Sequence, residues 1–490
     1  MTRINSRVIW LIIGPLIFII IVSFYHPKGL EPAGIAVLAT ACWMAVWWIA
    51  EAVPIAITSL LPIVLFPLTG GLGISDTTAA YGDKIIFLYM GSFMIALAIE
   101  RWNLHKRIAL QVIYIIGTNL PKIILGFMIA TALLSMWISN TATAVMMFPI
   151  GLSVVRQFGN DRQGTPIKEE IFGKALMLAI AYSASIGGMA TLIGTPPNLV
   201  FAGVIQKTFG KEITFMNWLI IGLPVSMLLL ALGWRYLVYH AFRLKNISFP
   251  AGKNEIGMQL KALGPLQKEE IRVIWVFAIT ALIWIFRGIL EKFIPGLDDT
   301  IPAILAGISL FIIPAKREKR KLITWEDALK MPWGIFLLFG GGLALAAGFS
   351  KSGLAAWIAG QFVAFQYLPL LILLLLLVAA VNFLTEITSN TATTAMLLPI
   401  LAPLALSINA NPYQLMIAAT LAASCAFMLP VATPPNAIVF GSGYLRIPDM
   451  VKTGIVMNIV SILLVGLFVY FILPHLHGFA DFIAQLLLQI

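Results

Sequence analysis

The sequence predicts an all-α polytopic membrane protein that contains two repeats. Of its 490 residues, 60% are hydrophobic and 11% are charged, whereas soluble domains carry about 25% charged residues. The mean hydropathy is +0.96. A twelve-residue string also recurs, since residues 139–150 read SNTATAVMMFPI and residues 389–400 read SNTATTAMLLPI. This recurrence within apolar sequence predicts an internal duplication in one membrane domain.

Apolar runs near the length that a bilayer requires, about 20 residues, follow one another along the chain. The first run follows Arg3 and Arg7 and no small-residue cleavage site comes after it, so we expect a retained span and not a signal peptide. The sequence predicts eleven spans, at 8–25, 33–51, 54–70, 86–100, 174–206, 216–240, 273–289, 301–314, 333–349, 413–440 and 450–473.

Two further runs, 121–155 and 366–405, are too long for one span, and each contains an SNTAT string. We expect each to form a re-entrant helical hairpin. Amphipathic stretches precede them at 101–118 and 351–365, and residues 243–272 form a polar connector.

A second pair of polar breaks follows the SNTAT strings. Residues 194–198 read GTPPN and residues 432–436 read ATPPN. Proline lacks a backbone N–H and ends a helix, so both spans are predicted to be broken helices. Unwound backbone within a membrane is tolerated only where it lines a cavity or is buried in protein. These breaks are therefore expected to form a binding site.

The distribution of Lys and Arg predicts the orientation of the chain. With the N-terminus in the cytoplasm and the C-terminus outside, 25 of the 32 basic residues are cytoplasmic. This bias supports a multi-pass protein of the cell membrane whose two halves are inverted repeats, although hairpins that cross the membrane fully give the same count. The seven external basic residues are Lys28, Lys84, Lys207, Lys211, Arg287, Lys292 and Lys351.

Several function classes are excluded by the residues present. The basic residues lie in short loops and form no stripe, so no nucleic-acid partner is expected. No histidine lies near an acid or a cysteine with metal-ligand spacing, and no Walker-type loop is present. We therefore expect neither an enzyme nor a primary pump. Cys42 and Cys425 lie in apolar runs and imply no disulfide framework.

The motif residues match two kinds of ligand. Their hydroxyls, amides and freed carbonyls suit Na⁺, and the N-termini of half-helices suit a carboxylate. Ser135 and Thr385 each lie four residues before a motif serine, and hence on the same helix face. Because no Lys or Arg lies within either motif stretch, we expect an anion to be bound by neutral dipoles, with sodium supplying the positive charge.

These motifs resemble those of the divalent-anion/sodium symporter family, the sodium-coupled di- and tricarboxylate carriers. Supporting stretches are WWIAEAVP at 47–54, IERWNLHKR at 99–107 and TEITSNT at 385–391. The resemblance covers about residues 33–473 and implies a homodimer with a scaffold and a moving transport domain in each protomer. The implied parts are 1–118 (scaffold with the N-terminal span), 119–242 (transport), 243–365 (connector and scaffold) and 366–490 (transport).

The resemblance also implies the site residues. The substrate would be bound by Asn140, Thr141, Asn390 and Thr391, with Thr195, Pro196, Thr433 and Pro434 beside them. The sodium ligands would be Ser135, Ser139, Asn140 and the Gly194 carbonyl at one site, and Thr385, Thr388, Asn390 and the Ala432 carbonyl at the other. A cation at position 388 could instead be held by backbone. Glu386 has two open interpretations, tuning of the cation site or a structural hydrogen bond within the hairpin.

The function implied is sodium-coupled symport of C4-dicarboxylates, of the succinate, malate or fumarate type, by an elevator-like motion. No cofactor is expected apart from Na⁺ as the coupling ion, and the partners would be the dicarboxylate, sodium and the lipid bilayer. A sodium-independent di- or tricarboxylate exchanger and a sodium-coupled sulfate carrier remain alternatives. Neither the preferred anion nor the sodium stoichiometry follows from the sequence.

Overall fold

The computed structural model describes residues 6–117, 119–159, 165–244, 250–315, 320–361 and 367–476. The predicted all-α membrane fold is confirmed, because nine helices of the described residues are long and apolar enough to cross a bilayer, and five shorter apolar helices accompany them. The number of eleven spans, the re-entrance of the hairpins and the opposite orientation of the repeats stay predictions. In the described part, two short strands pair antiparallel, β1 (Pro314–Ala315) and β2 (Arg320–Lys321), with Pro314 opposite Lys321.

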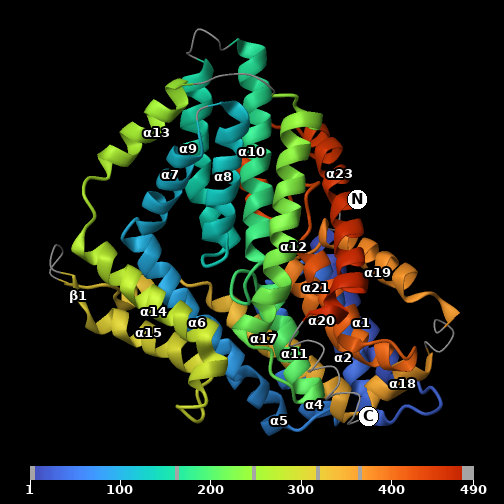
Figure 1. Ribbon diagram of the computed structural model, residues 1–490. Helices are drawn as coiled ribbons and strands as arrows, with labels where there is room; N and C mark the ends of the chain where they lie inside the picture. Colours follow the sequence, from blue (N-terminus) through green and yellow to red (C-terminus); the bar gives the residue numbers. More distant parts are fainter. Residues whose placement is uncertain are drawn as a thin grey trace.

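The first half of the chain is a series of helices joined by short turns (Figure 1). They are α1 (Ser6–Phe24), α2 (Pro32–Ala50), α3 (Ile55–Thr58), α4 (Leu61–Thr69), α5 (Ile74–Ala79), η1 (Ala80–Gly82), α6 (Lys84–Arg101), α7 (Leu104–Ile116), α8 (Leu120–Ser135), α9 (Asn140–Gly159), α10 (Pro166–Gly188), α11 (Pro196–Phe209), α12 (Phe215–Arg235) and η2 (Tyr236–Ala241).

The second half continues in the same manner. Its helices are α13 (Pro250–Ala262), α14 (Lys268–Leu290), α15 (Thr300–Ile312), α16 (Trp325–Ala328), α17 (Trp333–Lys351), α18 (Leu354–Gln361), α19 (Leu370–Thr385), α20 (Asn390–Ser407), α21 (Pro412–Ala423), α22 (Pro434–Phe440), α23 (Ile447–Leu467), η4 (Phe468–Ile472) and η5 (Leu473–His475).

The packing repeats between the halves. Helix α10 packs against α8, α9 and α12, and α21 packs against α19, α20 and α23 in the same way. Helices from different halves also meet, since α22 packs on α9 and α10, and α11 packs on α20 and α21. The two sets of motifs, about 250 residues apart in sequence, therefore belong to one packed unit.

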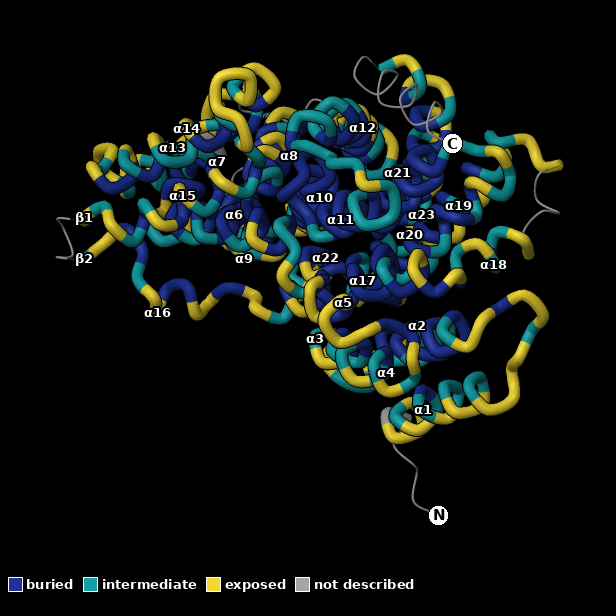
Figure 2. The backbone as a smooth tube through the Cα atoms, turned by 90° about the horizontal axis from the view of Figure 1, so that it is seen from below, coloured by how far each residue is buried: buried dark blue, intermediate teal, exposed yellow. Residues whose placement is uncertain are grey.

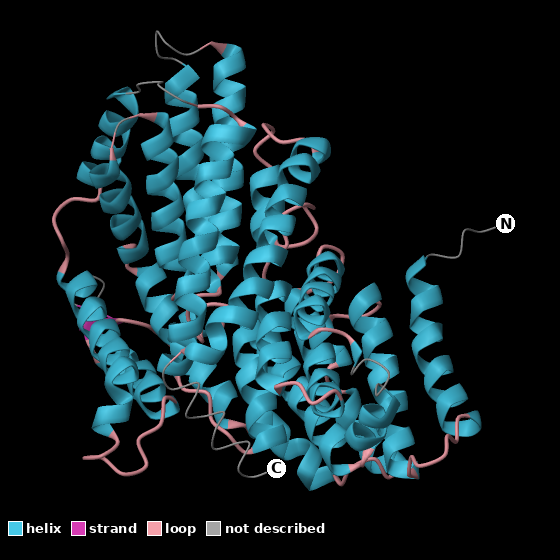
Figure 3. Cartoon of the chain, turned by 45° about the vertical axis from the view of Figure 1, so that its right-hand side comes forward, coloured by secondary structure: helices cyan, strands magenta, loops and turns pink. Residues whose placement is uncertain are grey.

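Burial places this unit at the centre of the molecule. Figure 2 shows α10 and α11 as largely buried and α1 as exposed at the periphery, where it packs on α2; Figure 3 shows the same N-terminal helix standing apart. Helix α10 is buried from Phe172 to Gly188 on nearly every face, as expected for a helix surrounded by others. Its backbone is thus well placed to support a buried site.

Some elements differ from the sequence prediction, for example the span predicted at 54–70, which consists of α3 and α4. Helix α10 begins at Pro166, two turns before the predicted span, because Thr165 caps it by accepting a hydrogen bond from Lys168 N at 3.3 Å. The polar connector contains a helix of its own, α13, which packs on α7 and α9.

The predicted helix breaks are confirmed at both motif pairs. Helices α8 and α9 are separated by residues 136–139, and α19 and α20 by residues 386–389. The second breaks cover residues 189–195 and 424–433. After each second break a proline opens the new helix, where its missing N–H leaves no helical hydrogen bond unmade.

Candidate functional site

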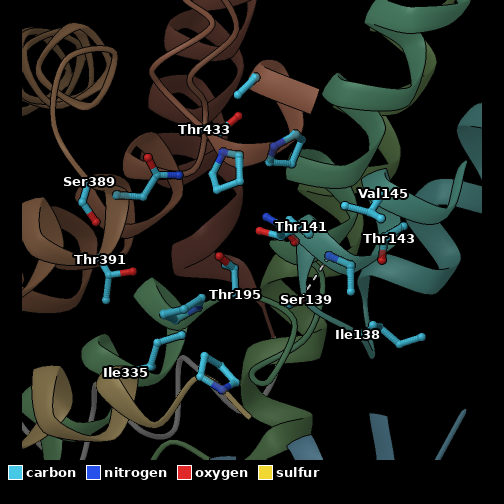
Figure 4. A pocket seen from close by; sticks show the side chains of 18 of the residues that line it. Ile138, Ser139, Thr141, Thr143, Val145, Thr195, Ile335, Ser389, Thr391 and Thr433 are labelled. Atoms are coloured by element: carbon cyan, nitrogen blue, oxygen red, sulfur yellow. Dashed lines mark hydrogen bonds between the residues drawn. The ribbon is translucent and has the colours of Figure 1, made fainter. Parts of the chain in front are cut away.

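The four breaks surround one cavity of about 1020 Å³. Figure 4 shows Thr141, Thr195, Ser389, Thr391 and Thr433 around this space, from both halves of the chain. The structure brings together all eight predicted substrate residues as lining residues: Asn140, Thr141, Asn390, Thr391, Thr195, Pro196, Thr433 and Pro434. The volume lies at the upper end of the range for small-molecule sites, about 300–1,000 Å³.

Four helices begin at the cavity wall. Helix α9 starts at Asn140, α11 at Pro196, α20 at Asn390 and α22 at Pro434, and all four of these residues line the cavity. A helix N-terminus carries the positive end of the helix dipole and unpaired N–H groups, although the Pro-Pro starts of α11 and α22 lack two of these groups. Four such ends give the cavity a positive character without a basic side chain at the motifs.

A cluster of three oxygen atoms lies beside the first SNTAT break. Ser135 Oγ is 2.7 Å from Asn140 Oδ1 and 2.6 Å from the Ala184 carbonyl oxygen. The hydroxyl has one proton and cannot donate to both acceptors at once. With the Asn140 amide oriented so that its oxygen faces Ser135, one of the close oxygen pairs lacks a proton, an arrangement that a cation would stabilise.

The second half repeats this cluster. Thr385 Oγ1 lies 2.7 Å from Asn390 Oδ1 and 3.0 Å from the Ala423 carbonyl oxygen. Ser135 and Thr385 are both fully buried, just behind the cavity wall. The structure thus places both predicted hydroxyls against the predicted asparagines, and their role as sodium ligands stays a prediction.

The other predicted sodium ligands lie close by. Ser139, Gly194, Thr388 and Ala432 all line the cavity. The Thr388 hydroxyl donates to the Leu384 carbonyl at 2.8 Å and also contacts Thr393 Oγ1 at 2.6 Å. Because that hydroxyl is already engaged within its own hairpin, the geometry favours the alternative in which backbone at position 388 faces the cation.

Two asparagines that were given no role from the sequence hold the second breaks. Asn198 Nδ2 donates to the carbonyls of Gly188 and Thr191 at 3.2 and 2.7 Å. Asn436 Nδ2 donates to Ala426 and Leu429 at 3.2 and 3.0 Å. Both asparagines are the last residue of the duplicated motif, GTPPN or ATPPN. This shared position could have indicated that both side chains stabilise the non-helical backbone of the breaks.

Gly188 was also not predicted. A Cβ at this position would lie 2.3 Å from Asn140 Oδ1, and a Cβ at Gly194 would lie 2.5 Å from the Gly188 carbonyl. Only glycine allows the first break to approach the SNTAT helix so closely. At the equivalent positions the second half has Ala426 and Ala432.

The remaining cavity wall comes from the early helices of each half. Tyr89 and Phe93 of α6 line it, and so does Ile335 of α17. Among the described lining residues Lys330 is the only Lys or Arg. Like Glu51, Glu100 and His105, which also line the cavity, it lies outside the motif stretches of the sequence. The polar groups at the four helix starts are therefore neutral, as predicted.

His105 contributes no positive charge at neutral pH. Burial lowers the pKa of this histidine, and its Nδ1 lies 3.0 Å from the Ile99 carbonyl oxygen. Because a carbonyl can only accept, the ring proton sits on Nδ1.

A family model for the sodium:sulfate symporter transmembrane region matches residues 5–474. The chain belongs to this family. The sodium-dependent dicarboxylate transporter SdcS of Staphylococcus saprophyticus is 46% identical over 480 residues, covering 96% of this chain and 92% of the relative. The protein of the same name from Staphylococcus aureus strain MRSA252 is 46% identical over 481 residues, covering 97% and 92%.

Two solved structures share the fold. MtrF of Neisseria gonorrhoeae has a TM-score of 0.60 with 13% identity and covers 96% of both chains. The YdaH transporter of Alcanivorax borkumensis has a TM-score of 0.58 with 15% identity, covering 82% of this chain and 88% of its own. The predicted family is thus confirmed, and the protein is a multi-pass membrane protein of a transporter family.

Proposed function

We propose that this protein is a secondary active transporter that carries a C4-dicarboxylate, of the succinate, malate or fumarate type, with Na⁺ across the cell membrane. The observation that carries the proposal is the convergence of four helix N-termini and two oxygen clusters on one cavity. Each helix end favours an anion by about 0.3–1 kcal/mol. The sodium-dependent dicarboxylate transporters that it resembles at 46% identity support this choice.

The duplicated motifs fit the two ends of a dicarboxylate. Asn140 and Thr141 offer an amide and a hydroxyl on one side, and Asn390 and Thr391 offer the same groups on the other. A dicarboxylate can place one carboxylate at each motif. A single tetrahedral anion such as sulfate can occupy only one of the two motifs. A dicarboxylate therefore fits the two motifs better than sulfate does.

Sodium is the expected source of positive charge. Two carboxylates moved into a cavity whose motif groups are neutral would be strongly disfavoured without a counter-charge. Cations bound at the Ser135 and Thr385 clusters would supply it, because the same asparagines line the cavity and belong to the clusters. This shared use of Asn140 and Asn390 supports symport over sodium-independent exchange.

Uptake of radiolabelled succinate into proteoliposomes tests the proposal. We expect uptake that depends on an inward Na⁺ gradient and that unlabelled malate and fumarate inhibit more strongly than sulfate or citrate. Sodium-independent uptake that requires internal dicarboxylate would establish the exchanger instead. Sodium-dependent uptake of radiolabelled sulfate, with no uptake of succinate, would establish the sulfate carrier.

We also propose that residues 119–242 and 366–490 move together as the transport unit, in an elevator-like motion past a scaffold that forms the homodimer. Contacts between the two segments support a rigid unit. Lys174 Nζ lies 3.1 Å from Asp449 Oδ2, and the Tyr444 hydroxyl donates to Glu169 Oε1 at 2.8 Å. Helices α7 and α18, which precede the two hairpins, are the candidate connecting arms.

At one point the contact between the proposed unit and scaffold is formed by small residues. An ideal Cβ at Gly342 of α17 would lie 3.1 Å from Ala395 Cβ of α20. Such close contact of small side chains leaves few interlocking groups to hinder sliding. The same spacing is near that of a disulfide, whose Cβ atoms are about 3.5–4.5 Å apart.

A cross-link at this contact tests the motion. In a chain without Cys42 and Cys425, the pair Gly342→Cys and Ala395→Cys is expected to stop uptake when oxidised and to permit it when reduced. A matched control joins two scaffold helices, because a Cβ at Gly334 would lie 3.1 Å from Ala56 Cβ. Full uptake through a verified 342–395 bond would reject the elevator motion.

A further inference from the structure

Glu386 is a buried acid at the second SNTAT break, with 3% of its surface exposed. Its Oε1 accepts hydrogen bonds from Phe427 N at 2.8 Å, Met428 N at 3.0 Å and Asn458 Nδ2 at 2.8 Å. Its Oε2 accepts one from Leu429 N at 3.0 Å. All four groups are neutral donors, and a carboxylate that only accepts is the form that matches them.

The first half has no counterpart to this carboxylate. The residue 250 positions earlier is Met136, and there the Thr191 hydroxyl donates to the Met136 backbone carbonyl. The two breaks are therefore held by different chemistry, although the oxygen clusters beside them are alike. Only the second break has a charged group at its centre.

Glu386 fixes the backbone of the second break from one side. It binds three successive N–H groups of residues 427–429, while Asn436 binds the carbonyls of Ala426 and Leu429 from the other side. Three peptide planes are thereby oriented by one side chain. Glu386 directly follows Thr385 in the chain. The residue that holds the backbone of residues 427–429 is therefore adjacent to a member of the second oxygen cluster.

The charge of Glu386 also acts on the second cluster. Among the described residues no Lys, Arg or His forms an ion pair with it. An unpaired acid within a membrane attracts a cation and repels an anion, because the low dielectric screens charge weakly. Thr385, the residue before Glu386 in the chain, belongs to an oxygen cluster that could hold the compensating cation.

We propose that Glu386 positions the second break and makes the Thr385–Asn390 cluster the tighter of the two sodium sites. The inference rests on the proposed sodium-coupled uptake. Glu386 acts through the backbone and through its charge, and it is a positioning residue with no contact to substrate.

Three variants separate charge, shape and fold. Glu386→Gln keeps the size and removes the charge, and Glu386→Asp keeps the charge on a shorter side chain. Met136→Gln places the same amide at the equivalent position of the first half, as the matched control. The readouts are the sodium concentration for half-maximal succinate uptake and the KM for succinate at saturating sodium.

We expect Glu386→Gln to raise the half-saturating sodium concentration about tenfold, the size expected when hydrogen bonds to a charged group are weakened. Its KM for succinate at saturating sodium should stay within about twofold of wild type. Glu386→Asp should fall between wild type and the Gln variant, and Met136→Gln should match wild type within about twofold.

A wild-type sodium response in Glu386→Gln overturns the inference, and so does an equal loss of succinate affinity at limiting and saturating sodium. If the Gln variant does not fold, the same comparison of the half-saturating sodium concentration with wild type is made for the Asp variant. Failure of both to fold beside a folded Met136→Gln also overturns it, because a purely structural role then suffices. Sodium-independent uptake by the wild type would instead reject the proposed function itself.

Discussion

Replacement of Gly188 by alanine is expected to disable the first sodium site. The new Cβ would lie 2.3 Å from Asn140 Oδ1, whereas ordinary contact begins near 3.4 Å, so the amide must retreat by about 1.1 Å. Asn140 Oδ1 lies only 2.7 Å from Ser135 Oγ. A retreat of that size separates the oxygens of the cluster, and the helix that begins at Asn140 limits how far the side chain can adapt.

The magnitude follows from the cost of overpacking. An extra methyl group in a close-packed interior costs about 1–3 kcal/mol, which corresponds to a factor of about 5–150 in an equilibrium constant. If sodium binding bears this cost, the half-saturating sodium concentration of Gly188→Ala rises by that factor. Succinate uptake into proteoliposomes, measured over a range of sodium concentrations, gives this value directly.

The matched control is Gly288→Ala in α14, where an added Cβ meets no atom within 4 Å. This variant should retain the wild-type sodium response, and its helix gains about 1 kcal/mol of intrinsic propensity. A wild-type sodium response in Gly188→Ala would show that Asn140 is not a sodium ligand. The reasoning from the oxygen cluster would then be refuted.

Two further predictions concern single side chains. Ser135→Ala and Thr385→Ala each remove one cluster oxygen, so each should raise the half-saturating sodium concentration about tenfold and change the succinate KM at saturating sodium less; an unchanged sodium response would reject that cluster. Glu212 lies between α11 and α12. Burial raises the pKa of its carboxyl group, but hydrogen bonds and charges from Arg287 and Lys84 lower it more, so that the pKa lies below the ordinary 4.5. This contribution to stability is full above about pH 4.5 and is lost as pH falls through the lower folded pKa. The melting temperature of the wild type should therefore fall more steeply on acidification than that of Glu212→Gln, and parallel pH profiles would contradict the assignment.

The starts of the helices after the second breaks were predictable because local sequence dictates them. The prolines at 196–197 and 434–435 open α11 and α22, where the missing N–H leaves no helical hydrogen bond unmade, whereas the preceding helices already end at Gly188 and Ala423. The contacts of Ser135 with Asn140 and of Thr385 with Asn390 were expected only from the family resemblance, because α8 ends at Ser135 and α19 at Thr385, so the predicted helical spacing to Ser139 and Ser389 does not apply.

The remaining parts of the site depend on tertiary packing. The Ala184 and Ala423 carbonyls complete the oxygen clusters from 49 and 38 residues away, and no side-chain signal marks a backbone oxygen. The need for glycine at 188 arises only when α10 meets the start of α9.

Glu386 shows the same limit. A structural hydrogen bond within its hairpin was one interpretation, whereas its described hydrogen bonds reach residues 427–429 and Asn458 outside the hairpin. The partners lie about 40–70 residues away in sequence, so only the packing of α19 against α21 and α23 reveals them. The role in tuning the cation site stays a prediction.

The central claim is that two sodium sites and one anion site share the asparagines of the duplicated motif. Equilibrium binding of radiolabelled succinate to the purified protein, measured as Kd against sodium concentration, tests it most directly. Because linked binding is reciprocal, two shared sites predict that log Kd falls against log sodium concentration with a slope approaching −2 below saturation. Ser135→Ala and Thr385→Ala each weaken one site, so their curves should shift to higher sodium concentrations and keep a slope near −2 below saturation. A Kd for succinate that does not change with sodium would contradict the account.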